Sequence, residues 1–95
     1  MPRLDWTEAA DADMHRIVDY IAKENPFAAI NVGDEIERQT DLLQTRPGVG
    51  RPGRIGETRE LVLTGLPYIV CYVADSETVS VLRVLHGSQQ WIEEV

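Results

Sequence analysis

The chain has 95 residues, of which 43% are hydrophobic and 26% are charged, and its formal net charge is −7. This length suits one domain, and we expect residues 1–95 to form a single one. The negative charge argues against broad, non-specific nucleic-acid binding, which depends on neutralising phosphates. The only cysteine, Cys71, has no partner for an internal disulfide, and no apolar run is long enough to cross a membrane. These features predict a cytoplasmic protein.

The first predicted helix follows Thr7, whose hydroxyl can cap the free N–H groups at a helix start. Behind it, apolar residues recur at spacings of three and four, the pattern of a helix with one buried face. These residues are Ala10, Met14, Ile17, Val18 and Ile21. The segment before Thr7, residues 2–6, has the length of an edge strand.

Asn25-Pro26 ends the first helix and starts a second. Proline disfavours helical geometry in the residue before it but suits the first position of a helix. The apolar stripe of the second helix comprises Ala29, Val32, Ile36 and Leu43. We expect this helix to end near Arg46, just before Pro47. A break this short folds two helices into an antiparallel hairpin.

Residues 47–56 contain four glycines and two prolines, a composition that predicts neither helix nor strand. The loop is also basic. Residues 1–46 hold five Lys or Arg against ten Asp or Glu, whereas residues 46–59 hold four arginines against Glu57 alone. The four are Arg46, Arg51, Arg54 and Arg59. An acidic first half is therefore followed by a local basic loop.

Three apolar, β-rich runs complete the chain, at residues 59–63, 68–74 and 78–85. Turn signals separate them, at residues 64–67 and at Asp75-Ser76. The middle run is apolar almost throughout, as in a central strand, and its neighbours alternate. The sequence predicts an α+β fold, with an N-terminal helical hairpin packed on a three- to four-stranded antiparallel sheet.

Motifs along nearly the whole chain resemble those of the RelE/ParE superfamily of bacterial type II toxins. In chain order these motifs are Trp6-Thr7-Glu8-Ala9-Ala10, Ile17-Val18-Asp19-Tyr20-Ile21-Ala22, Asn25-Pro26, Pro47-Gly48-Val49-Gly50-Arg51, Thr58-Arg59-Glu60-Leu61-Val62, Pro67-Tyr68-Ile69-Val70, and Arg83-Val84-Leu85-His86-Gly87 before Gln90-Trp91. The resemblance implies the same hairpin-on-sheet fold. It also implies a growth-inhibiting toxin that a cognate antitoxin neutralises. The chain looks closer to the ParE-like members.

The resemblance implies two kinds of target. ParE-like members poison DNA gyrase, whereas RelE-like members cut mRNA on the ribosome without a metal. Metal-free cleavage needs a base, an acid and cations around the phosphate. If this chain is such a nuclease, the candidates are His86 as acid or base, with Arg83 and Arg59 as catalytic cations. Whether the chain is an enzyme stays open at this point.

Three features favour the protein-directed reading, with gyrase as the target. The nuclease members carry an arginine just before the aromatic residue of the central strand, where this chain has Pro67-Tyr68. Regular strand alternation would place Arg83 with Val79 and Val81, and His86 on the opposite face. The chain has a single lysine, and a ribosome is a strongly anionic partner. A third reading is a non-toxic module that only binds an antitoxin.

We expect target binding through the basic loop and the C-terminal indole, that is, through Arg51, Arg54, Arg59 and Trp91. We expect antitoxin binding on the acidic hairpin, at Asp19, Glu35, Leu42 and Leu43. Structural roles compete with these: Arg83 can pair with an acid of the hairpin, such as Asp19 or Glu35, and Trp91 can cap the core. The glycines match no phosphate-binding loop, and we expect no metal and no cofactor.

Overall fold

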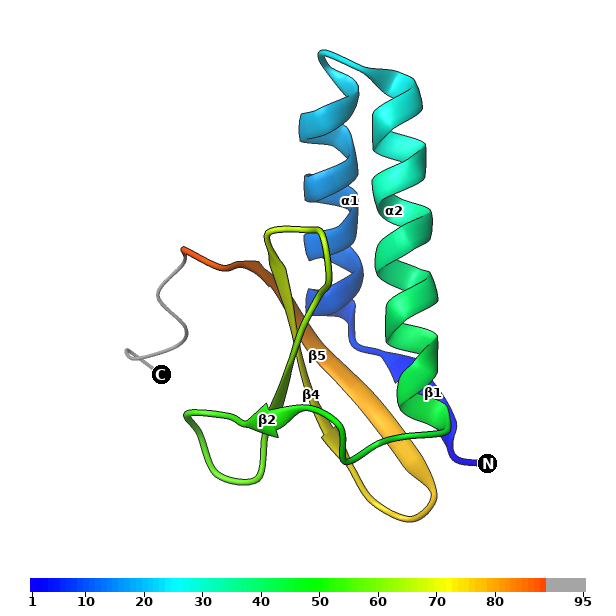
Figure 1. Cartoon of the computed structure of the whole chain (residues 1–95), viewed down its shortest axis with the longest axis vertical. Helices are drawn as coiled ribbons and strands as arrows, with labels where there is room; N and C mark the ends of the chain where they lie inside the picture. The colour runs from blue at the N-terminus through cyan, green and yellow to red at the C-terminus, as the bar shows by residue number, and fades with distance from the viewer. Residues whose placement is uncertain (89–95) are drawn as a thin grey trace.

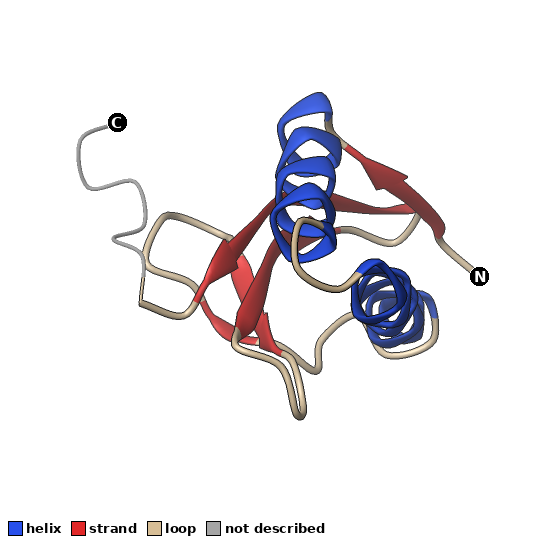
Figure 2. Ribbon diagram, turned by 90° about the horizontal axis from the view of Figure 1, so that it is seen from above, coloured by secondary structure: helices blue, strands red, loops and turns tan. Residues whose placement is uncertain are grey.

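The computed structural model describes residues 1–88 and consists of two long helices packed on one five-stranded sheet (Figures 1 and 2). The helices are α1 (Glu8–Ala22) and α2 (Pro26–Asp41), followed by the short 3₁₀ helix η1 (Leu42–Gln44). The strands are β1 (Arg3–Trp6), β2 (Arg51–Pro52), β3 (Arg59–Val62), β4 (Tyr68–Ala74) and β5 (Thr78–His86). The predicted α+β fold with a helical hairpin is confirmed. Within residues 1–88, no helix is long and apolar enough to span a membrane.

The sheet has more strands than predicted, and one pair is parallel. Its order is β1-β5-β4-β3-β2, and β1 runs parallel to β5 whereas all other neighbours are antiparallel. The segment before α1 therefore supplies an edge strand. The prediction that the glycine-rich loop contains no strand is wrong for β2. Pro52 is tolerated there because an edge strand leaves one row of N–H groups without a ladder partner.

Both helices begin with a side-chain cap, and the cap predicted at Thr7 is confirmed. Thr7 Oγ1 accepts a hydrogen bond from the Ala10 N–H at 3.1 Å, and Asn25 Oδ1 accepts one from the Ala28 N–H at 3.0 Å. Pro26 takes the first position of α2. The predicted end of this helix near Arg46 is wrong, because the last turns tighten into η1, as helix ends often do.

A bulge in β5 changes the predicted faces of that strand. Val81 lies opposite Tyr72, but Arg83 lies opposite Cys71, so Leu82 is one extra residue. The bulge moves Arg83 off the face that Val81 shares with the helices, contrary to the prediction from regular alternation. His86 follows three residues after Arg83, beyond the bulge. The two side chains therefore still lie on opposite faces of β5.

The core lies between the hairpin and the sheet. Its main cluster joins fully buried residues of both helices to the sheet: Ala10, Ile36, Leu63, Val70, Val81 and Val84. A second cluster lies under η1 and joins Leu43, Tyr72 and Val79. A third, formed by Cys71, Leu85 and Ile69, uses the strand positions that alternate with the main cluster and so lies on the other face of the sheet.

Asp13 ties α1 to β5 where β1 has ended. Its carboxylate is 3% exposed and accepts the Val84 N–H at 2.9 Å and Arg83 Nε at 2.8 Å. Arg16 Nη2 adds a contact at 2.7 Å. Burial alone would raise the pKa of Asp13, but these hydrogen bonds and the Arg83 charge together hold it below its usual value. The buried carboxylate therefore remains ionised.

Replacing Asp13 by Asn should lower the free energy of unfolding at neutral pH by about 2–3 kcal/mol, because a half-buried arginine loses its counter-charge. Since the folded-state pKa of Asp13 is below its unfolded value, the contribution is complete above the unfolded pKa. It is lost as the pH falls through the folded pKa. Denaturant unfolding across acidic pH checks this. Asp19→Asn, an exposed change on the same helix, should stay within about 0.5 kcal/mol of the unchanged chain. Equal pH profiles for the two variants would contradict the role of Asp13.

Candidate functional site

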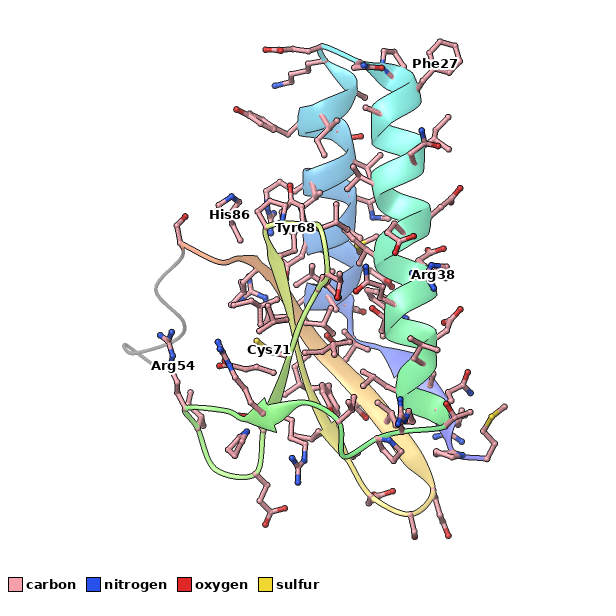
Figure 3. The ribbon with its side chains drawn as sticks, viewed as in Figure 1. Phe27, Arg38, Arg54, Tyr68, Cys71 and His86 are labelled. Carbon is pink, nitrogen blue, oxygen red and sulfur yellow. The ribbon has the colours of Figure 1, made fainter. Side chains whose placement is uncertain are left out.

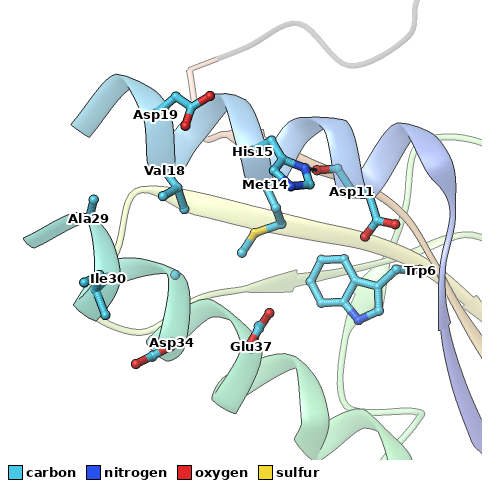
Figure 4. A pocket seen from close by; sticks show the side chains of 11 residues that line it. Trp6, Asp11, Met14, His15, Val18, Asp19, Ala29, Ile30, Asp34 and Glu37 are labelled. Carbon is cyan, nitrogen blue, oxygen red and sulfur yellow. Dashed lines mark hydrogen bonds between the residues drawn. The ribbon is translucent and has the colours of Figure 1, made fainter. Parts of the chain in front are cut away.

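A groove of about 420 Å³ lies between α1 and α2 (Figure 4). Its apolar lining is Trp6, Met14, Val18, Ala29 and Ile30. Its polar lining is Asp11, Asp19, Asp34, Glu37 and His15. The eleventh lining residue is Gly33, where a Cβ would meet Val18 Cγ2 at 3.3 Å, so glycine lets the helices approach. None of the eleven is Lys or Arg, and the groove is apolar with an acidic rim.

The four residues predicted to bind an antitoxin do not share one surface. Asp19 lies on the groove. Glu35 does not line it and is held by Arg38 at 2.6 Å and by Gln39 at 2.8 Å, which lower its pKa to about 2. Leu42, the first residue of η1, is 51% exposed and follows the C-terminal end of α2.

Leu43 is fully buried, so the expectation that its side chain meets a partner does not hold for the folded chain. It packs in the core cluster with Tyr72 and Val79. The sequence reasoning missed Asp34 and Glu37. The sequence does contain a pattern that points to them, because residues 30, 33, 34 and 37 recur at helical spacing and mark one face of α2.

In the basic loop, Arg51 and Arg59 have partners within the molecule. Arg51 forms an ion pair with Glu60 at 2.9 Å, and that carboxylate is 4% exposed. Arg59 Nη1 donates to the Gly50 carbonyl at 2.8 Å and to the Gly48 carbonyl at 3.4 Å. Arg54 is the exposed arginine of the loop tip, far from the hairpin tip marked by Phe27 (Figure 3).

The small core cluster around Cys71 lies on the face of the sheet away from the main core. Arg54 and Glu60 border it, and Ile69, Cys71 and Leu85 form its centre. Burial, with Glu60 nearby, raises the pKa of the Cys71 thiol to about 12. The thiol stays protonated at neutral pH, which suits a core residue rather than a nucleophile.

Arg83 and His86 do not converge. Asp13 holds the Arg83 guanidinium through two hydrogen bonds, of 2.8 and 3.0 Å, and its hydrogen bond raises the pKa of Arg83. The expected pairing of Arg83 with a hairpin acid is therefore observed, but the acid is Asp13 and neither Asp19 nor Glu35. Asp13 carried a signal of its own, because it sits four residues before Ile17 within the apolar stripe of α1.

His86 is exposed and lies across from Tyr68, with ring centroids 5.7 Å apart in an edge-to-face arrangement (Figure 3). Its Nδ1 lies 2.8 Å from Ser88 Oγ. Together with Arg16, Ile17 and Tyr20, these two rings line a second hollow, of about 330 Å³. Trp91, predicted to contact the target, lies outside the described residues.

The chain matches a family model and two known proteins along nearly its whole length. The family model described as ParE toxin of type II toxin-antitoxin system, parDE, matches residues 4–91. "Putative toxin Y4kP" of Sinorhizobium fredii is 45% identical over 89 residues, which cover 94% of this chain and 92% of that protein. "Toxin RelE2" of Caulobacter vibrioides is 32% identical, over 94% and 99% of the two chains.

A solved structure agrees with these sequence matches. The structure titled "Chromosomal ParDE TA system from P. aeruginosa" superposes with a TM-score of 0.83 at 28% identity, over 90% of this chain and 96% of that one. The hairpin-on-sheet architecture, the matched family model and the two relatives all agree. The chain belongs to the ParE family of toxins of type II toxin–antitoxin systems.

Proposed function

We propose that this chain inhibits growth by binding a protein target, DNA gyrase, and that a cognate antitoxin neutralises it. The observation that carries the choice of a protein target is the engagement of the arginines. Asp13 holds Arg83, Glu60 holds Arg51, and loop carbonyls hold Arg59. A surface whose cations already have partners suits binding more than phosphate chemistry.

A ribosome-dependent nuclease is the alternative, and it makes different demands. It needs an acid, a base and several cations around one phosphate. Among residues 1–88, Arg83 turns to Asp13 while His86 lies against Tyr68. These positions supply no shared site for a scissile phosphate, so they favour the gyrase proposal. The two proposals separate in a direct assay.

Purified chain should inhibit supercoiling by gyrase or trap cleaved DNA, and His86→Ala should inhibit as well as the unchanged chain. Translated mRNA should remain intact in the same samples. Codon-positioned cuts that disappear in His86→Ala would favour the nuclease instead. Normal growth when the chain is induced without an antitoxin would contradict toxicity altogether and leave a binding module.

The groove between α1 and α2 supports the antitoxin half of the proposal. Its apolar floor and its four carboxylates complement an amphipathic segment with apolar anchors and Lys or Arg beside them. Apolar burial there would supply affinity, while the carboxylates would steer a cationic chain toward a protein of net charge −7. Of the residues predicted to bind the antitoxin, Asp19 fits this surface.

Asp34→Lys should weaken antitoxin binding at least about tenfold, because it places a cation on the acidic rim. Isothermal titration against the antitoxin measures the change, and it should shrink as salt rises. Glu77→Lys is the matched control, since it makes the same charge change at an exposed turn between β4 and β5. Equal affinities for Asp34→Lys and Glu77→Lys would show that the antitoxin binds elsewhere.

A further inference from the structure

The basic loop has a defined backbone conformation although its sequence favours disorder. Residues 47–56 contain four glycines and two prolines, and a glycine-rich backbone loses the most conformational freedom on folding. The loop crosses from the end of η1 to β2 and on to β3 (Figure 1). Side chains outside the loop supply many of its hydrogen bonds, and two side chains of the sheet, those of Tyr72 and Arg59, bind its backbone.

Tyr72 is the first of these residues. Its ring is fully buried in the cluster with Leu43, so its hydroxyl has one position. That hydroxyl donates to the Pro47 carbonyl at 2.6 Å and accepts from the Gly50 N–H at 2.9 Å. A phenol can do both at once. One core side chain thus fixes two backbone groups of the loop, three residues apart.

Arg59 is the second. It lies directly across from Tyr72 in the pairing of β3 and β4, so the two side chains emerge on one face. Its Nη1 donates to the carbonyls of Gly50 and Gly48. Together the cross-strand pair binds the loop backbone at Pro47, Gly48 and Gly50, on both sides of Val49.

The fit leaves no space at Gly50. A Cβ there would lie 2.6 Å from the Tyr72 hydroxyl oxygen and 3.0 Å from the Glu60 carbonyl oxygen. At Gly48, a Cβ would have no neighbour within 4 Å. The backbone at Gly50 therefore rests on the sheet itself, and any side chain at that position must move the loop.

We propose that Tyr72 and Arg59 are positioning residues for target binding, acting through the loop and not by contact with the target. Anchoring Gly50 sets the next residue, Arg51 of β2, in register with Glu60 of β3. The same anchor fixes where the tip with Arg54 can reach. This inference rests on the proposed function. It changes the expected role of Arg59, which positions the loop that contacts the target and does not contact the target itself.

The test compares Tyr72→Phe, Gly50→Ala and the matched control Gly48→Ala in the full chain. Tyr72→Phe keeps the buried ring and removes both hydrogen bonds, and Gly50→Ala displaces the loop with Tyr72 intact. Each should reduce gyrase inhibition at least about tenfold, while affinity for the antitoxin changes less than about twofold. Gly48→Ala should match the unchanged chain in both assays. A parallel loss of antitoxin binding in Tyr72→Phe would indicate general unfolding and overturn the proposal.

The second part of the test uses Arg59→Lys, because lysine keeps the positive charge but lacks the guanidinium donors. Its loss of inhibition should not add to that of Tyr72→Phe in the double variant, since both release the same loop. Full additivity would show direct contact of Arg59 with the target and overturn the positioning role.

Hydrogen exchange separates this inference from the proposed function. The Gly50 amide should exchange faster in Tyr72→Phe than in Gly48→Ala, whatever the target is. Unchanged exchange at Gly50 would refute the anchor. If the unchanged chain fails to inhibit gyrase but exchange rises as expected, the gyrase target is wrong and the anchor stands. Growth arrest on induction then replaces gyrase inhibition as the readout for the same variants.

Discussion

A buried carboxylate joins the two layers of this protein. Asp13 lies on the apolar stripe of α1, yet its oxygens reach the Val84 N–H and the Arg83 guanidinium on β5. β1 ends at Trp6, so the edge of β5 beyond it would carry an unpaired N–H without Asp13. Such a pair adds little net stability compared with an apolar contact, but it fixes one helix position against one strand register.

The same contact decides how Arg83 is used. The bulge at Leu82 turns Arg83 away from the main core, and Asp13 then holds its guanidinium at the sheet edge. Arg51 and Arg59 are also used within the molecule, since Arg51 forms an ion pair with Glu60 and Arg59 donates a hydrogen bond to a loop carbonyl. A chain with nine basic residues against sixteen acidic ones therefore uses several arginines as internal supports.

The acidic groove and the basic loop lie in separate regions of the molecule. Helix residues of the hairpin line the groove, whereas the loop packs on the β3–β4 side of the sheet, with Arg54 far from Phe27 at the hairpin tip (Figure 3). The proposed function assigns the antitoxin and the target to these two separate surfaces of opposite charge.

The sequence by itself determined the local structure. Thr7 and Asn25 mark the helix starts, the three- and four-residue spacing marks the buried helix faces, and apolar runs mark β3, β4 and β5, because these signals act between near neighbours. The family resemblance came from the same local motifs. Tertiary structure decided what depends on distant contacts. It placed β1 parallel to β5, inserted Leu82 as a bulge, and selected Asp13, not Asp19 or Glu35, as the partner of Arg83. A one-residue shift in a strand reverses which face a side chain occupies, and only packing against the helices selects the register.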